Sequence, residues 1–177
     1  MTLFFYDCKK IDKMGIINIK NLYIMDVRHI SDLSKVSIIT NEMVELVNEL
    51  KNSFKRGFIA LSDGAYAVSS HMFTVDAQTV SHFINDDKHF LVEVVIEGKQ
   101  AIHVASASDT CFRVAGPNCS GDEAKVLKGD ARDEMLVLTK DEFCVIYPTQ
   151  AYKTSTTIPT TASSEVKKVT IYIPFKN

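Results

Sequence analysis

The sequence contains neither a block of basic residues nor a long apolar run. Its 20 Lys and Arg residues and 22 Asp and Glu residues give the 177-residue chain a formal net charge of -2 at pH 7. Because proteins bind a phosphate backbone through clustered positive charge, nucleic acid is not expected as a partner. The apolar runs are also far shorter than the about 20 residues of a membrane span, so a membrane is not expected as a partner either.

The N-terminal stretch MTLFFYDCKK lacks the basic start and the long apolar centre of a signal peptide. We therefore expect a cytoplasmic protein. Hydrophobic residues make up 46% of the chain, which is an ordinary value for a folded domain. Since single domains span roughly 100 to 200 residues, residues 14–177 are interpreted as one domain and residues 1–13 as an N-terminal extension.

The four cysteines include no C-x-x-C pair, which excludes a zinc knuckle and a redox motif of that type. Cys8 and Cys144 lie far from the other cysteines in the sequence. Cys111 and Cys119 are close enough for a short disulfide loop, but a reducing compartment disfavours such a bond. We predict four free thiols.

One segment, Asn41–Lys51, has the 3.6-residue period of an amphipathic helix. Thr40 or Asn41 can cap its N-terminus, and the negative charge of Glu42 is favourable there. The helix is expected to pack against a sheet. Its apolar positions are Met43, Val44, Leu46, Val47 and Leu50.

After Lys51 the apolar residues recur with a period of 2, which is typical of strands. Groups of turn-forming residues at 62–64 and 97–99 separate neighbouring runs. Many short strands with regular turns indicate a sandwich or a barrel, and residues 109–122 and 154–164 are expected to be loops. The expected strands are Phe58–Leu61, Ala65–Phe73, Lys88–Ile96, Ala101–Ala105, Glu134–Leu138, Phe143–Tyr147 and Val166–Pro174.

One carboxylate, Glu93, stands within the strand expected at 88–96. The even positions of this strand are all apolar, and Glu93 lies on the opposite face among the odd positions. An isolated buried carboxylate is costly, so such a group usually has a partner, a ligand or water beside it. Glu93 therefore indicates a site.

The same alternation gives each neighbouring strand one face that carries polar groups. It groups His71 with Ser69, places His103 opposite its apolar neighbours, and puts Tyr172 on the face of Thr170. If these faces line the inside of a small barrel, the two histidines and Tyr172 converge on Glu93 in one cavity, together with His89. If they face solvent, the strands are simply amphipathic.

Four stretches, from about Met14 to the C-terminus, resemble the YhcH/YjgK/YiaL family in their order. They read LSDGAYAVSSHMFT, HFINDDKHFLVEVVIEGKQAIHVA, LTKDEFCVIYPTQAY and EVKKVTIYIPF. The family includes the small subunit of evolved β-galactosidase and a sialic acid anomerase. The resemblance implies an all-β fold, a cupin-like double-stranded β-helix (jelly-roll barrel) with one packed N-terminal helix. It also implies a homodimer whose cavity holds a divalent metal and a sugar-like ligand.

The chain departs from the family pattern at the positions that would bind this metal. Ile84 stands in place of a Glu, Asp86 in place of a His, Leu91 in place of an Asp, and Tyr152 in place of a His. Ile and Leu cannot coordinate a cation, and Tyr is a poor substitute for imidazole. The usual metal site is therefore expected to be absent, and no cofactor is predicted.

The resemblance implies sugar anomerisation, which acid and base side chains can catalyse without a cofactor. Glu93 is the candidate base, and His71 or His103 is the candidate acid. A divalent metal such as zinc stays open as an alternative, held by these same two histidines and Glu93. The candidate contacts to a sugar or sugar acid are Lys88, His89, Tyr152 and Tyr172.

A second function is also compatible with this barrel and ranks after the first. The apolar side chains of Leu91 and Ile84 make the expected cavity less polar than a sugar-converting site requires. The β-galactosidase relative indicates that the fold can serve as a partner subunit. A non-catalytic carbohydrate-binding protein or an accessory subunit of another enzyme is therefore the alternative.

Overall fold

The computed structural model describes residues 26–117 and 124–175 of the chain. Eleven strands form one antiparallel network in the order β2-β3-β11-β5-β10-β4-β7-β6, from which β8, β9 and β1 branch. The elements are β1 (Arg28–His29), η2 (Ile30–Lys35), α1 (Asn41–Asn52), β2 (Gly57–Ala60), η3 (Ser62–Gly64), β3 (Tyr66–Phe73), β4 (Phe83–Asn85), β5 (His89–Ser106), β6 (Arg113–Pro117), β7 (Lys125–Lys128), β8 (Glu134–Thr139), β9 (Glu142–Ile146), β10 (Gln150–Thr156) and β11 (Glu165–Pro174).

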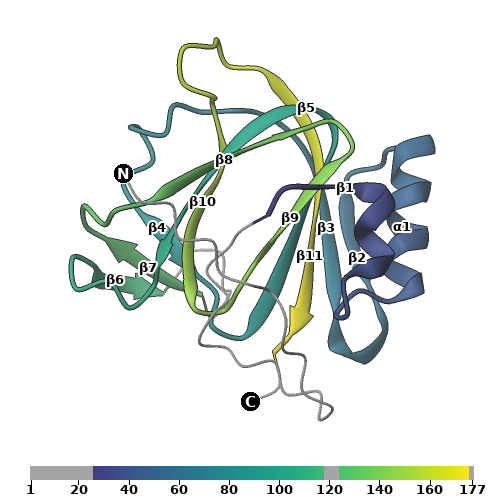
Figure 1. Cartoon of the computed structure of the whole chain (residues 1–177), viewed down its shortest axis with the longest axis horizontal. Coiled ribbons are helices and arrows are strands. Elements are labelled where there is room, and N and C mark those ends of the chain that lie inside the picture. The colour runs from purple at the N-terminus through teal and green to yellow at the C-terminus, as the bar shows by residue number, and fades with distance from the viewer. Residues whose placement is uncertain (1–25, 118–123, 176–177) are drawn as a thin grey trace, which may run out of the picture.

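The long strand β5 belongs to two sheets. Its first half pairs with β11 and β9, and its second half pairs with β10 and β8. The two sheets therefore face each other across a common interior, and Figure 1 shows them curving into a barrel. The expected all-β, cupin-like barrel is confirmed.

Helix α1 covers the outside of the first sheet, beside β2 and β3 (Figure 1). Thr40 caps the helix, because its hydroxyl accepts a hydrogen bond from the backbone N–H of Met43 at 3.4 Å. This packed helix confirms the prediction made for residues 41–51. The buried residues of the layer between helix and sheet are Leu33, Met43, Leu46, Val47, Leu50, Ala65, Ala67, Val92, Val94, Ile96, Phe143, Val169 and Ile171.

A second apolar cluster fills much of the space between the two sheets. In β5 it includes Leu91 and Val95 from the first half, and Ile102 and Val104 from the second half. The inward positions thus change from odd to even numbers along the strand. The register between β5 and β11 explains this change, because Lys168 pairs with Val95 while the preceding residue of β11 pairs with Glu97, two positions farther along β5.

The prediction of two separate strands at 88–96 and 101–105 is wrong, because the chain continues through residues 97–99 without a turn. Gly98 makes this possible with a φ of +86°. A Cβ atom at Gly98 would lie 2.2 Å from the carbonyl oxygen of Glu165, so only glycine fits between the strands. The strands β1, β4, β6, β7 and β10 were not predicted. β6 lies in the loop expected at 109–122, and β10 includes residues 154–156 of the loop expected at 154–164.

Some predictions lie outside the described residues. They concern the N-terminal extension at 1–13 and the thiols of Cys8 and Cys119, and with Cys119 the disfavoured disulfide. In the described part of the chain, Cys111 and Cys144 are free thiols. No helix there combines the length and the apolar character that crossing a membrane requires.

The helix layer provides a test of the fold. Leu46→Ala should lower the free energy of unfolding by about 2–5 kcal/mol, because Leu46 is buried between α1 and the sheet. Urea denaturation measures the change. Glu49→Ala on the exposed side of the same helix is the control and should change the value by less than about 0.5 kcal/mol. Equal losses in the two variants would mean that α1 does not pack through this face.

Candidate functional site

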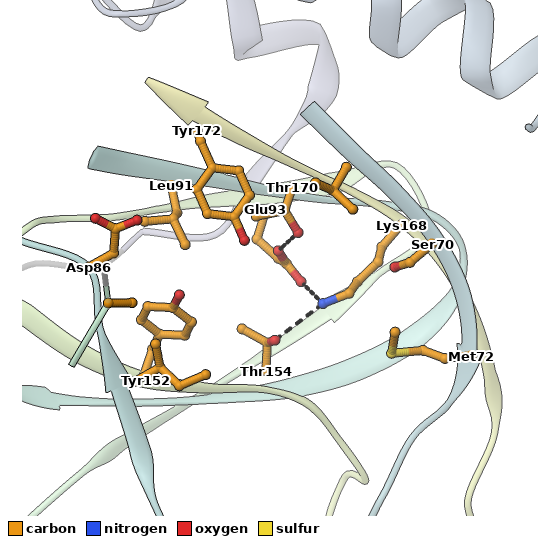
Figure 2. A pocket seen from close by; sticks show the side chains of 13 residues that line it. Ser70, Met72, Asp86, Leu91, Glu93, Tyr152, Thr154, Lys168, Thr170 and Tyr172 are labelled. Carbon is orange, nitrogen blue, oxygen red and sulfur yellow. Dashed lines mark hydrogen bonds and ion pairs between the residues drawn. The ribbon is translucent and has the colours of Figure 1, made fainter. Parts of the chain in front are cut away.

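A cavity of about 230 Å³ lies inside the barrel and is bounded by both sheets (Figure 2). One wall comes from β3, β5 and β11, and the opposite wall comes from β4 and β10. The lining residues are Val68, Ser70, Met72, Ile84, Asp86, Leu91, Glu93, Ala124, Tyr152, Thr154, Lys168, Thr170 and Tyr172.

Glu93 lines this cavity, although only 1% of its surface is exposed. Three side chains donate hydrogen bonds to its carboxylate. One carboxylate oxygen, Oε1, accepts hydrogen bonds from Gln100 Nε2 at 3.1 Å and from Lys168 Nζ. The other oxygen, Oε2, accepts from Thr170 Oγ1 at 2.6 Å. The buried carboxylate is thus neutralised by an ammonium group and bonded through both oxygens.

Strand pairing brings these groups together. Glu93 of β5 lies directly opposite Thr170 of β11, so both side chains point to the same face. Lys168 lies two positions before Thr170 and therefore shares that face. Only 5% of the surface of Lys168 is exposed. Its ammonium group also donates a hydrogen bond to Thr154 Oγ1 of β10 at 3.2 Å. The ion pair therefore links the two sheets across the cavity (Figure 2).

Tyr152 faces this ion pair from the second sheet. Only 7% of the residue is exposed, and burial, followed by the neighbouring Tyr172 and Asp86, raises the pKa of its phenol. The backbone of Tyr152 pairs with β5 and β4, but its phenol makes no hydrogen bond to the described residues. The hydroxyl groups of Tyr152 and Tyr172 both point into the cavity (Figure 2). A ligand in the cavity would therefore meet a neutral phenol that can donate a hydrogen bond.

Asp86 also lines the cavity, but its carboxylate is engaged by the following turn. Asp86 Oδ1 accepts hydrogen bonds from the backbone N–H groups of Lys88 and His89 at 3.0 and 3.1 Å. Its other oxygen lies 2.9 Å from His89 Nδ1. The His89 ring in turn packs edge-on against Tyr66 and Tyr172. His89 therefore supports the cavity wall, while Lys88 is exposed and does not line the cavity.

The prediction that His71 shares the cavity with Glu93 is wrong. Val68 of β3 lies opposite Thr170, which lies opposite Glu93, so Val68 is on the cavity face. His71 is three positions farther along β3 and therefore points to the opposite face. There its Nε2 lies 3.3 Å from Glu165 Oε2, at a partly exposed position.

The prediction for His103 is wrong for a different reason. Glu93 and His103 both have odd numbers in the same strand, but the inward positions of β5 change to even numbers after Val95. His103 consequently lies on the outer face of the second sheet, where its Nδ1 is 2.6 Å from Asp133 Oδ2. One extra residue in a strand exchanges the two faces beyond it, and the sequence pattern did not reveal this residue.

The alternative metal set of His71, Glu93 and His103 is wrong as well, because its members lie on different faces. Within residues 26–117 and 124–175, no group of three or more His, Cys, Asp and Glu side chains could hold a metal ion. The four family metal positions, Ile84, Asp86, Leu91 and Tyr152, do all line the cavity. Their only carboxylate is held by its own turn, so these residues do not fit a divalent metal.

Sequence reasoning missed Lys168, Gln100 and Thr154. The alternation in EVKKVTIYIP could have placed Lys168 on the face of Thr170 and Tyr172, since all three have even numbers. Gln100 could not be found in this way, because it lies beyond the extra residue of β5. Thr154 could not be found either, because it lies in a segment expected to be a loop.

No protein-family model matches the chain, and neither does any curated protein. A solved structure of hydroquinone 1,2-dioxygenase PnpCD, in complex with Cd2+ and 4-hydroxybenzonitrile, aligns with 13% identity and a TM-score of 0.41. The alignment covers 79% of this chain and 80% of that chain.

Two vicilins align less well. Those from Corylus avellana (hazelnut) and Solanum melongena show 9% and 13% identity and a TM-score of 0.37 each. The alignments cover 84% and 76% of this chain but only 29% and 37% of the vicilin chains. Likenesses as low as these three carry no argument for function.

The ion pair provides the second test. Lys168→Met should lower the free energy of unfolding by about 3–5 kcal/mol, because it leaves the buried Glu93 carboxylate without its counter-charge. In the double variant Glu93→Gln/Lys168→Met, no charge is left buried. Its loss should be smaller than the sum of the two single losses by at least about 1 kcal/mol.

The neighbouring Lys167 is the matched control, since its ion pair with Glu97 is partly exposed. Lys167→Met should cost less than about 1 kcal/mol in the same urea titration. Strictly additive losses in the double variant, or equal losses for the two lysines, would contradict the pairing.

Proposed function

We propose that the barrel cavity binds a small, uncharged, hydroxylated molecule of the sugar class, and that the protein acts as a binding protein or accessory subunit. The observation that carries this proposal is that the charged groups among the described residues of the cavity lining are all paired. Glu93 is bonded to Lys168, and Asp86 is bonded to His89. A ligand with its own net charge would have to break one of these pairs, whereas a neutral ligand need not.

The polar groups left for a ligand suit hydroxyl groups. The Tyr152 phenol can donate and accept, and Lys168 uses two of its three N–H donors in the contacts to Glu93 and Thr154. Leu91, Ile84 and the face of the Tyr172 ring provide apolar area between these points. A mixture of apolar walls and a few placed polar groups is typical of small-molecule sites.

The resemblance to the YhcH/YjgK/YiaL family supports the same ligand class, because the four family metal positions line this cavity. In this chain they are Ile84, Asp86, Leu91 and Tyr152, so the proposed binding does not involve a metal. The homodimer that the resemblance implies is part of this proposal. A binding role agrees best with Glu93, because both oxygens of its carboxylate are already held by hydrogen bonds from the protein.

Ligand binding can be measured by saturation-transfer NMR and calorimetry with a panel of neutral monosaccharides, polyols and sugar acids. We expect a neutral compound to bind, and Tyr152→Phe to weaken its binding by about 2- to 10-fold through the loss of one hydrogen bond. Tyr147→Phe is the control, because this tyrosine does not line the cavity. Binding of sugar acids alone, or equal effects of the two variants, would refute the proposal.

Sugar anomerisation is the second candidate, because a carboxylate and a phenol, Glu93 and Tyr152, line one cavity. Glu93 would take the proton of the anomeric hydroxyl and Tyr152 would donate to the ring oxygen. Exchange spectroscopy of the bound sugar decides between the candidates. If the protein only binds, it leaves the rate of anomer exchange unchanged. Acceleration that Glu93→Gln abolishes would establish the enzyme instead.

A further inference from the structure

Strand β2 lies at one end of the strand order, and β3 is its one neighbour among the described strands. In an antiparallel pair, the backbone groups of alternate residues point to the partner strand, and those of the other residues point away from it. The backbone N–H of Leu61 donates to the carbonyl of Ala65 at 2.9 Å, so the odd-numbered residues point to β3. The N–H and C=O groups of Phe58 and Ala60 therefore point to the outer edge of the sheet.

Phe58 is the exposed end of a column of stacked aromatic rings. The rings of Tyr172 and Tyr66 stack with centres 4.5 Å apart and planes at 8°, and those of Tyr66 and Phe58 with centres 5.3 Å apart and planes at 25°. Tyr172 lines the cavity, whereas Phe58 is 67% exposed. The column crosses the strands from β11 to β2, so a strand added at the edge would place its side chains next to the Phe58 ring.

The two ends of β2 carry opposite charges. Lys55 and Arg56 precede the strand and Asp63 follows it, and all three residues are exposed. Glu42 adds a second negative charge next to Asp63, because its carboxylate accepts a hydrogen bond from the backbone N–H of Ser62 at 3.0 Å. A strand with one positive and one negative end is complementary to an antiparallel copy of itself.

We propose that β2 is the interface of a homodimer, in which two copies of the chain pair antiparallel through this edge about a two-fold axis at Ile59. This register places Phe58 opposite Ala60 of the second copy, so the outward backbone groups of both residues bond across the interface. It also brings Lys55 beside Asp63 of the second copy. A shift of the register by two residues would separate these charges.

This interface deepens the proposed function, because it gives the homodimer included there a place on the molecule, and it rests on that function in this respect only. Across the axis, the Phe58 rings of the two copies become diagonal neighbours, which joins the two aromatic columns. Because β2 has only four residues, the interface is small. We therefore expect a weak dimer that dissociates on dilution.

Analytical ultracentrifugation of the full chain, from about 1 μM to about 1 mM, should show a monomer at the lower and a dimer at the upper end. Phe58→Asp should weaken dimerisation about tenfold or more, because it places a carboxylate among apolar groups at the interface. Val114→Asp is the matched control and should have no effect. Val114 is also 67% exposed, but it lies in β6 at the other end of the strand order.

Two further measurements test the register. Lys55→Glu should weaken the dimer a few-fold, because it places like charges beside each other at both ends of the interface. Lys128→Glu makes the same change of net charge at an exposed position of β7 and should leave the dimer unchanged. In hydrogen exchange, the amides of Phe58 and Ala60 should exchange more slowly in the dimer than after dilution to the monomer.

Three results would overturn the proposal. They are a monomer at every concentration, equal effects of Phe58→Asp and Val114→Asp, and slow exchange of the Phe58 and Ala60 amides at every dilution, which would mean that the same chain covers the edge. The substituted positions are all exposed, so the variants keep the fold. A monomer that binds a neutral sugar would refute this interface alone, and a dimer that binds none would refute the cavity proposal alone.

Discussion

The ion pair between Glu93 and Lys168 determines the charge of the barrel interior. A carboxylate with 1% of its surface exposed is stable only if its charge is balanced, and the ammonium group of the neighbouring strand balances it. Because Lys168 also bonds Thr154 of the opposite sheet, the pair fixes the distance between the two walls. The cavity thus has a polar centre with little free charge, which favours binding of a neutral molecule over proton transfer.

The bulge in β5 controls the rest of the site. Without the extra residue at Ile96, strict alternation would place His103 on the inner face of the strand and Gln100 on the outer face. With it, the strand presents Gln100 to the carboxylate and His103 to the outer face. The bulge therefore gives the Glu93 carboxylate an amide as its neighbour from the second half of β5. An amide can hold the carboxylate in place but cannot exchange protons with it at neutral pH.

The sequence allowed the local parts of this structure to be predicted, and the long-range parts much less. The helix at 41–51 has a strong period and a clear cap, and the strands at 65–73 and 166–174 have clear alternation, so these elements were found. The three-residue strand β4 has too few positions to show a period. Glu93 was identified as buried and in need of a partner. Its partner Lys168 was not, because that requires the register between two strands that bring together residues 75 positions apart.

The same bulge explains why one strand presents two faces of different chemistry. In β5, a side chain that points inward meets the apolar cluster and the neutral ion pair, whereas one that points outward after the bulge meets loops with carboxylates. Glu93 and His103 are only ten positions apart, yet the wall between them is the backbone of the sheet itself. Substitutions on the outer face should therefore leave the cavity in place as long as the hydrogen bonds of β5 to β10 and β11 persist.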